Sequence, residues 1–357
     1  MSASETPSRK TGGPTRALVT GGTGFLGQAI VARLLARGDG VAVLARRASR
    51  IPPAWAGRVD VRYGDLTDVR SVAASLHDVD TVAHSAALVT YSGARRDDYL
   101  RVNVQGTENV LAAMTAAGVR RLLHVSSVAV YGVERDHRGA NEAAPYGVQT
   151  LSPYAASKIE AERRVLDYGR RGLLAVSVAR PGWIWGPGDG ANVPRLMPFI
   201  RRGLVPLMGH GDNVLHLSYV ENVAEGCVVA LTSERAVGQV YNLTDGGSVT
   251  YRRFVGDLVQ ALGMRPRYVR IPFGAAYALA ALMEGLYNVI PGGRLPPLTR
   301  WLVLNTVRHM EFDIAKARRE LGYAPRVTYE DGMRQTTPWL RALAQGARAA
   351  EKEATST

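Results

Sequence analysis

The fold is decided by the stretch Thr20-Gly21-Gly22-Thr23-Gly24-Phe25-Leu26-Gly27, which stands between a short apolar run at residues 17–20 and a helical pattern at 24–36. Its glycines follow a Gly-x-x-Gly-x-x-Gly spacing at a junction between a strand and a helix. Glycine there permits a tight turn and lets backbone N–H groups approach a pyrophosphate, which the helix N-terminus attracts. A tight turn can also need glycine for packing alone. The strand before it and the helix after it favour a nucleotide-binding loop.

Short β-branched runs and helical patterns alternate from this loop to Ala179. Further strands are predicted at residues 41–44, 59–63, 81–84, 122–126 and 174–179, and further helices at 98–117 and 154–168. Strict alternation of strand and helix means parallel pairing, with right-handed crossovers that place helices on both faces of the sheet. The sequence therefore predicts an α/β fold with a Rossmann-type, doubly wound parallel sheet.

The pattern changes after Arg180. Pro and Gly crowd residues 181–190, a strand at 240–243 could return to the sheet, and the chain from Ser248 onward is mostly helical. We therefore expect a smaller, mostly helical C-terminal substrate-binding part. The expected division is a disordered tail at 1–15, a dinucleotide-binding domain at 16–183 with 212–245 returning to it, a substrate-binding part at 184–211 and 246–340, and a frayed tail at 341–357.

Composition narrows the functional class. The 357 residues include 44 Lys+Arg against 31 Asp+Glu, a net charge of +13. The arginines are scattered, and no helix-turn-helix pattern, zinc spacing or aromatic RNA-binding signature favours nucleic acid. The single cysteine, Cys227, excludes a disulfide framework, and the dispersed histidines predict no metal site. Without a signal-peptide pattern or an apolar run of about 18 residues, the sequence predicts a cytoplasmic protein.

The end of the second predicted strand indicates which dinucleotide binds. An acidic residue there selects NAD by bonding the ribose 2′-hydroxyl, whereas an arginine accommodates the 2′-phosphate of NADP. Ala45 is followed by Arg46 and Arg47, with Ser49 nearby and no acid. Both arginines could simply be solvated at a strand end, but their guanidinium groups suit bidentate phosphate contact. The sequence favours NADP(H), with NAD as the alternative.

A second pair of motifs suggests proton transfer. Ser126-Ser127 ends a predicted strand, and Tyr154-x-x-x-Lys158 opens a predicted helix, where positions i and i+4 share one face. The lysine cation would favour the phenolate and lower the pKa of the tyrosine, while a serine hydroxyl could bond the same substrate oxygen. A Tyr-x-x-x-Lys pattern can also be an ordinary exposed helical pair. Its position behind the glycine loop and the Ser-Ser strand end favours the catalytic interpretation.

Together these motifs resemble the extended short-chain dehydrogenase/reductase superfamily over nearly the whole chain. The resemblance implies that Ser127, Tyr154 and Lys158 are catalytic, and that Asn103 has a structural and proton-relay role. It also implies that Asp65 bonds the adenine amino group. The implied cofactor-binding residues are Gly21, Thr23, Gly24, Phe25, Leu26, Gly27, Arg46, Arg47, Asp65, Leu66, Ser85, Ala86, Ala87, Lys158, Pro181, Trp183 and Ile184.

Differences from the sequence motifs of the superfamily's sugar enzymes indicate which branch of the superfamily this chain resembles. Sugar dehydratases carry Thr-Asp-Glu where this chain has Ser126-Ser127-Val128, and sugar epimerases carry a diphosphate-binding arginine where it has Leu215. Trp183, Ile184 and Trp185 follow the sixth predicted strand. These features are similar to the 3β-hydroxysteroid dehydrogenase branch and its bacterial 2-alkyl-3-oxoalkanoate reductases. The implied substrate contacts are Ser127, Tyr154, Trp183 and Trp185.

The resemblance implies an NAD(P)-dependent oxidoreductase that interconverts a ketone and a secondary alcohol by hydride transfer. Its substrate would be hydrophobic, either steroid-like or a β-keto or β-hydroxy acid, with the tyrosine as acid and base. Two alternatives stay open. One is a nucleotide-sugar epimerase, which Leu215 disfavours, and the other is a non-enzymatic NADP-sensing module, in which the tyrosine or lysine is usually lost.

Other features concern partners and minor candidates. The apolar stretch at 274–290 could pack against the sheet or dock on a membrane surface, as some relatives do. Two long helices often make dimers in this superfamily, so a homodimer is a further expectation. His216 is expected to be packed or solvent-facing rather than catalytic, and Cys227, in an apolar helical context, to be inert.

Overall fold

The computed structural model describes residues 15–90, 93–147, 151–289 and 294–355. Its largest layer is a seven-stranded sheet in the order β11-β7-β5-β4-β1-β2-β3, in which all neighbours are parallel. The strands are β1 (Arg16–Thr20), β2 (Gly40–Ala45), β3 (Val59–Tyr63), β4 (Thr81–His84), β5 (Arg121–Val125), β7 (Ala175–Pro181) and β11 (Val240–Leu243). The order reverses between β1 and β4, which confirms the doubly wound sheet and opens a crevice at the carboxyl ends of the strands.

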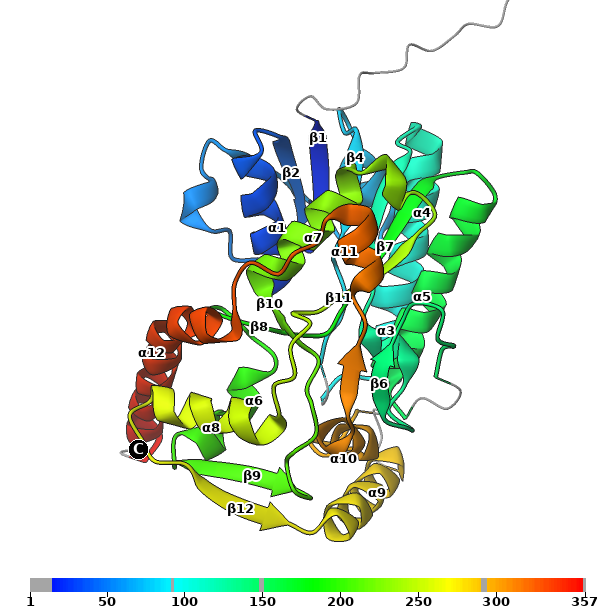
Figure 1. Cartoon of the computed structure of the whole chain (residues 1–357). Coiled ribbons are helices and arrows are strands. Elements are labelled where there is room, and N and C mark those ends of the chain that lie inside the picture. The colour runs from blue at the N-terminus through cyan, green and yellow to red at the C-terminus, as the bar shows by residue number, and fades with distance from the viewer. Residues whose placement is uncertain (1–14, 91–92, 148–150, 290–293, 356–357) are drawn as a thin grey trace, which may run out of the picture.

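Helices cover both faces of the sheet (Figure 1). One face carries α1 (Phe25–Ala36), α7 (Val220–Thr232) and α11 (Ala315–Leu321), and the other carries α2 (Val69–Ala74), α4 (Gly106–Ala117) and α5 (Pro153–Arg170). In α1 the buried residues Ile30, Val31 and Leu34 recur at helical spacing and form one apolar stripe against the sheet. The two faces therefore form two separate cores.

A second part lies beyond the carboxyl ends of the strands (Figure 1). It contains α6 (Val193–Ile200), β9 (Leu204–Met208), α8 (Tyr251–Ala261), β12 (Arg267–Ile271), α9 (Phe273–Val289), α10 (Arg300–Val307) and α12 (Tyr329–Thr355). β9 and β12 form a parallel pair, and a third core packs around Trp185, Tyr219 and Phe254. Two more parallel pairs are β8 (Trp183–Trp185) with β10 (Leu217–Tyr219), and β6 (His137–Ala140) with β13 (Met310–Phe312).

Several elements have the bounds that the sequence predicts. The strands predicted at 59–63, 81–84 and 240–243 are β3, β4 and β11. The helix predicted at 98–117 is divided into α3 (Arg96–Tyr99), a π-helical turn (Leu100–Gln105) and α4. Three short 3-10 helices are also described: η1 (Pro53–Trp55), η3 (Val128–Tyr131) and η4 (Glu234–Ala236).

The ends of the chain differ from the expectation or lie outside the structure. The segment predicted to fray at 341–357 is helical as far as Thr355 in α12, and Ala344 of this helix is buried in the third core. The disordered tail predicted at 1–15 lies outside the described residues, apart from Thr15. An amphipathic helix that packs on a core gains order from that burial, which a charge-rich composition alone does not reveal.

Helix α9 leaves most of its apolar surface uncovered. Its buried residues are Ala276 and Ala280, whereas Leu282 and Leu286 are 60% and 53% exposed. Burial against the sheet, one of the two expectations for residues 274–290, is therefore wrong; Ile290 itself lies outside the described residues. Among the helices that the structure describes, none is long and apolar enough to cross a membrane.

Replacing Phe254 by alanine should strongly destabilise the protein. Its ring is buried in the third core, where its centroid lies 5.7 Å from that of Trp183 and 5.6 Å from that of Trp185. Removing a buried aromatic ring leaves a cavity and costs about 3–5 kcal/mol of unfolding free energy, which urea denaturation would measure. The control is Phe199→Ala, because Phe199 is 41% exposed. Equal losses in the two variants would contradict the assignment of this core.

Candidate active site

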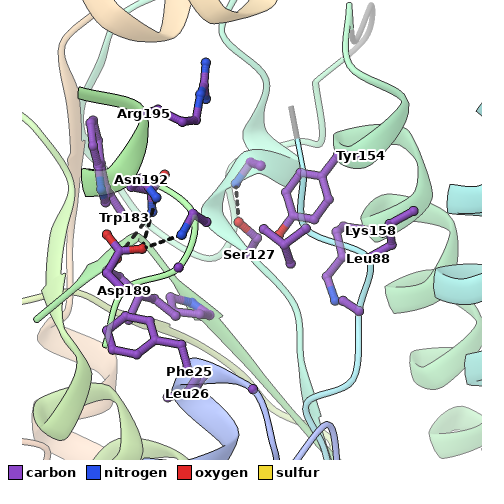
Figure 2. A pocket seen from close by; sticks show the side chains of 18 of the residues that line it. Phe25, Leu26, Leu88, Ser127, Tyr154, Lys158, Trp183, Asp189, Asn192 and Arg195 are labelled. Atoms are coloured by element: carbon purple, nitrogen blue, oxygen red, sulfur yellow. Dashed lines mark hydrogen bonds between the residues drawn. The ribbon is translucent and has the colours of Figure 1, made fainter. Parts of the chain in front are cut away.

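A cavity of about 1240 Å³ opens at the carboxyl ends of the sheet strands (Figure 2). Its walls include Thr20, Ala45, Val125 and Pro181, which are the last residues of β1, β2, β5 and β7. Further walls come from α6, α9 and α10 in the second part. A doubly wound sheet binds its ligand at this switch point, so the cavity is the candidate site.

The glycine loop forms one end of the cavity, and its first glycine leaves no room for a side chain. Gly21 has a φ of +70°, and a Cβ added there would lie 2.6 Å from the Ala86 nitrogen. Helix α1 begins at this loop without a side-chain cap and without an acid in its first turn, so its N–H groups and dipole favour an anion. This cradle fits the pyrophosphate of a dinucleotide. All the predicted loop contacts line the cavity: Gly21, Thr23, Gly24, Phe25, Leu26 and Gly27.

Arg46 and Arg47 diverge in the structure. Arg46 lines the cavity together with Ser49. Arg47 is absent from the described lining residues and instead places its guanidinium carbon 5.4 Å from the ring centre of Tyr63. In this structure Arg47 thus makes a cation–π contact, and its predicted contact with the cofactor stays a prediction.

Asp65, the predicted adenine contact, is organised by Thr67. The Thr67 N–H and hydroxyl donate to Asp65 Oδ1 at 2.8 and 2.7 Å. These hydrogen bonds, supported by the charges of Arg46 and Arg101, hold the pKa of Asp65 below its usual value. The resulting carboxylate can accept a hydrogen bond from an amino group, and Leu66 lines the cavity beside it.

The segment Ser85-Ala86-Ala87 continues from β4 along the cavity wall. His84, the residue before this segment, is fixed by two hydrogen bonds: its Nδ1 lies 2.7 Å from Thr20 Oγ1 and its Nε2 lies 2.9 Å from Thr107 Oγ1. The Thr107 hydroxyl already donates to a backbone carbonyl, so Nε2 of the histidine must be the donor to it. Burial, and then the charge of Lys158, lower the pKa of His84 to about 3, which keeps the ring neutral.

Ser127, Tyr154 and Lys158 line the same wall, and Figure 2 shows Ser127 and Tyr154 turned toward one another. Tyr154 and Lys158 lie one turn apart at the start of α5, whose N-cap Ser152 accepts a backbone N–H at 3.3 Å. Ser127 follows β5 and forms a side-chain hydrogen bond with Tyr154. Lys158 Nζ donates to the Val125 carbonyl at 2.6 Å. The end of β5 thus holds both members of the Tyr–Lys pair.

Burial is the largest influence on the pKa values of Tyr154 and Lys158. It raises the pKa of Tyr154 above its usual value, and the hydrogen bond with Ser127 opposes that shift. Burial also lowers the pKa of Lys158 to about 8, although the charge of Glu162 raises it. The sequence predicts that Lys158 lowers the pKa of Tyr154, whereas in the structure burial raises it. At neutral pH Tyr154 is a phenol that can donate a proton, and Lys158 is mostly cationic.

Asn103 is not among the described lining residues, but its hydrogen bonds connect two segments that form walls of the cavity. It lies in the π-helical turn, where Oδ1 accepts the Leu88 N–H at 2.7 Å and Nδ2 donates to the Leu88 carbonyl at 3.2 Å. Nδ2 also donates to Ser157 Oγ at 2.9 Å, beside Lys158 in the sequence. These bonds join the loop after β4 to α5, while the proton relay through Asn103 stays a prediction.

The two tryptophans of β8 have different surroundings. Trp183 lines the cavity, as do Ile184 and Pro181. Trp185 is completely buried in the third core, with its ring centroid 5.2 Å from that of Tyr219, and it is absent from the described lining residues. The expectation that Trp185 contacts substrate is therefore wrong. Alternate residues of a strand share a face, so both rings point into the same core and only the first reaches the cavity.

Two neighbouring residues before β10 bear on the alternative functions. Leu215 is buried in the third core and is absent from the described lining residues, so this position places no cation in the cavity. His216 does line the cavity, and its Nδ1 has no hydrogen-bond partner among the described residues. Burial, and then His137, lower the pKa of His216 to about 4, so the packed ring is neutral.

The sequence analysis missed most of the wall that the second part supplies. This wall is mainly apolar, and Arg195 of α6 adds a cation that Figure 2 shows apart from the Ser127–Tyr154 pair. Its apolar residues include Leu196, Met208, Leu279, Leu298, Trp301 and Leu302. No motif marks these positions, and the one usable signal was the apolar run at 274–290. Within the described ranges, no group of three or more His, Cys, Asp or Glu side chains could hold a metal ion.

Relatives of known activity share most of this chain. A 2-alkyl-3-oxoalkanoate reductase of Stenotrophomonas maltophilia (strain K279a) is 36% identical over 330 residues, which span 89% of this chain and 97% of that protein. A 3 beta-hydroxysteroid dehydrogenase/Delta 5-->4-isomerase of Mycobacterium tuberculosis (strain ATCC 25618 / H37Rv) is 33% identical over 345 residues, which span 92% of this chain and 91% of that protein. The similarity thus includes the second part as well as the sheet.

Solved structures and family models agree with these relatives. The UDP-glucose 4-epimerase of Thermus thermophilus, in complex with NAD, matches with a TM-score of 0.71 at 27% identity, covering 91% of this chain and 99% of that one. Residues 17–244 match the model of the NAD dependent epimerase/dehydratase family. With the glycine loop and the Ser127, Tyr154 and Lys158 cluster in one cavity, this chain belongs to that family, in the extended short-chain dehydrogenase/reductase superfamily.

Proposed function

We propose that the protein is an NAD(P)-dependent oxidoreductase that interconverts a ketone and a secondary alcohol on a hydrophobic substrate. The observation that carries the proposal is the Ser127–Tyr154–Lys158 cluster facing a largely apolar wall in the same cavity. A proton donor beside apolar space suits a carbonyl group on an apolar molecule, such as a steroid or a long-chain β-keto acid. The names of the two relatives above, a reductase and a hydroxysteroid dehydrogenase, support this reaction class.

Each residue of the cluster has a distinct task in the proposed reaction. When bound, the nicotinamide would supply the hydride for reduction and accept it for oxidation. Tyr154 donates its proton to the substrate oxygen, and the Ser127 hydroxyl holds that oxygen in place. The Lys158 cation stabilises the phenolate that remains, which makes the buried tyrosine a usable donor. In the direction of oxidation, the same phenolate accepts the proton of the alcohol.

The two alternatives are weaker at this site. A nucleotide sugar brings a diphosphate, whose binding relies on charge-assisted contacts, and Leu215 occupies a core where sugar epimerases have an arginine. A non-enzymatic sensing module would have no need for the hydrogen bonds that join Ser127 to Tyr154 and Lys158 to β5. These contacts support an enzyme, and the apolar wall supports an apolar substrate.

We also propose NADP(H) as the cofactor, with NAD as the alternative. β2 ends at Ala45, and the next residue, Arg46, lines the cavity with no acid beside it in the sequence. A guanidinium at this point can pair with a 2′-phosphate, which NAD lacks. The glycine loop and Asp65 suit the parts that the two cofactors share.

Phenylalanine at position 154 should abolish most of the activity. Tyr154→Phe keeps the ring but removes the proton donor, so NADPH oxidation with apolar ketones and β-keto acids should fall by about 10²- to 10⁴-fold. Tyr168→Phe is the matched control, because Tyr168 lies on the same helix, α5, and outside the described cavity lining. Conversion of a nucleotide sugar without net cofactor oxidation would favour the epimerase instead. Full biological activity of Tyr154→Phe would favour the sensing module.

Removing the Arg46 guanidinium should weaken NADPH binding selectively. One charge-assisted contact with the 2′-phosphate is worth about 1.5–3 kcal/mol, so Arg46→Ala should raise the Kd for NADPH by roughly 10- to 100-fold. The Kd for NADH should change little, and cofactor fluorescence would measure both. Arg47→Ala is the matched control, because Arg47 contacts Tyr63 rather than the cavity. Equal weakening of NADPH and NADH by Arg46→Ala would contradict the NADP assignment.

We further propose that the exposed face of α9 and β12 docks on an anionic lipid surface, from which an apolar substrate enters the cavity. Leu282 and Leu286 project from α9, and Arg267 and Arg270 are exposed on β12 beside it in the sequence. The single acid of α9, Glu284, is already paired with an arginine at 2.6 Å. Exposed apolar residues of α9 and exposed positive charge on the adjoining β12 together suit an anionic membrane. Leu279 continues this face into the cavity wall.

Acidic residues on this face should prevent docking. Leu282→Asp with Leu286→Asp should reduce sedimentation with vesicles that contain phosphatidylserine, because both positions are exposed and a charge there opposes insertion. Val237→Asp is the control, since Val237 is exposed on another surface after η4. Absence of binding by the unsubstituted protein would contradict the proposal. A doubled mass in solution that the paired substitution abolishes would assign the face to the expected homodimer.

A further inference from the structure

The end of β5 contacts one face of α5 through three consecutive residues. The pairs are Val125 with Lys158, Ser126 with Glu162, and Ser127 with Tyr154. On the helix, the three partners are spaced i, i+4 and i+8, so they lie in a row on one face. The strand end and the helix are therefore held in one register. Two of these pairs involve the catalytic cluster, and the third brings in Glu162, to which the sequence analysis gave no role.

Glu162 is completely buried and accepts hydrogen bonds from several sides. The Ser126 hydroxyl donates to Oε2, the Tyr146 hydroxyl donates to Oε1 at 2.9 Å, and Arg180 Nε and Nη2 donate to the carboxylate. Arg180 belongs to β7 and also donates to the Tyr131 hydroxyl at 2.7 Å. Because all these partners donate, they are satisfied by an ionised carboxylate. Glu162 therefore joins α5 to β5 and β7.

Few charged groups surround Lys158. Those that face it are Tyr154 and Glu162 on its own helix, His84 on β4 and His124 on β5. Burial, and then the charge of Lys158, lower the pKa values of both histidines, so neither carries charge at neutral pH. Glu162 is thus the anion of this described group. Its charge opposes the burial that favours the neutral amine of Lys158.

We propose, building on the oxidoreductase function above, that Glu162 is a positioning residue that holds β5 and α5 in register and keeps Lys158 cationic. The residue is absent from the described cavity lining, so it acts through Lys158 rather than on the substrate. A purely structural ion pair with Arg180 would stabilise the fold and leave the titration of the site unchanged. The two roles therefore differ in a measurable way.

The test is the pH profile of Glu162→Gln, which keeps the shape of the side chain and removes its charge. Without the anion, Lys158 loses its proton at lower pH, so the alkaline limb of kcat/KM should shift downward by about one pH unit. The KM for the ketone should change little. Glu160→Gln is the control, because Glu160 is on the same helix and pairs at 3.0 Å with Arg164. A folded Glu162→Gln variant with the unshifted limb would overturn the proposal.

Two further variants distinguish the effect of the Glu162 charge from that of its contact with β5. Glu162→Asp retains the charge, so it should restore the alkaline limb even if its rate stays low. Ser126→Ala removes one contact and leaves the charge, so it should lower kcat by roughly two- to tenfold without moving the alkaline limb. If Glu162→Gln does not fold, the other two variants test the proposal. A downward shift of the alkaline limb in Glu162→Asp, or an unchanged kcat in Ser126→Ala, would overturn it.

NADPH binding provides a readout that does not require a known ketone. Lys158 is a predicted cofactor contact, so the pH at which NADPH affinity falls should move downward in Glu162→Gln, as followed by cofactor fluorescence. If the unsubstituted protein reduces no ketone but this shift occurs, the oxidoreductase proposal fails and the role of Glu162 stands. If ketones are reduced but neither the pH profile of kcat/KM nor that of NADPH affinity shifts in Glu162→Gln, the oxidoreductase proposal stands and the role of Glu162 fails.

Discussion

The cavity depends on the close approach of Gly21 to the end of β4, where a Cβ on the glycine would lie 2.6 Å from the Ala86 nitrogen. β1 and β4 are neighbours at the point where the strand order reverses, so the chain must turn sharply there to enter α1. The turn directs the uncapped N-terminus of α1 toward the crevice. A side chain at position 21 would collide with the backbone of Ser85 and Ala86. The same contact therefore provides both the anion-binding end and the space for a cofactor.

Burial of charge governs the other end of the site. Lys158, Glu162 and Arg180 are all buried, and a buried charge is tolerated only when it is paired and hydrogen-bonded. Glu162 satisfies Arg180 directly, and it offsets part of the desolvation of Lys158 from one helical turn away. The phenol of Tyr154 is buried among these groups and keeps its proton. In the proposed reaction, the charge of Lys158 is therefore supported by a carboxylate that lies outside the described cavity lining.

The parts of the site that follow from local spacing were predictable from the sequence. The glycine loop and the Tyr154–Lys158 pair are defined by residues a few positions apart, and the structure brings both to one cavity. Adjacent residues after a strand point in different directions, so composition could not separate Arg46 from Arg47. In the structure Arg46 lines the cavity, whereas Arg47 contacts the ring of Tyr63 in β3.

The division of the tryptophans and the exposure of α9 depend on packing across the chain. Trp185 was assigned to the substrate by its place after a strand, but Phe254 and Tyr219 enclose it in a core made from distant segments. The apolar run that became α9 fits a buried helix equally well by pattern alone. Its exposure arises because the small cluster in which it packs, around Val303 of α10, buries only Ala276 and Ala280 of this helix. Periodicity identifies an apolar helix, whereas only the neighbours decide whether it is covered.

The lining of the cavity changes character from one end to the other, and this gradient restricts how a ligand can lie in it. Arg46 and Asp65 mark a polar end, whereas Leu279 and Trp301 belong to an apolar end. A dinucleotide has phosphates and ribose that need the polar end, so an apolar substrate must occupy the other. The two meet at the boundary, where Ser127 and Tyr154 provide the polar groups that a carbonyl oxygen requires. Leu279 of α9 lines this apolar end and is also 51% exposed, so the apolar end of the cavity reaches the surface at α9.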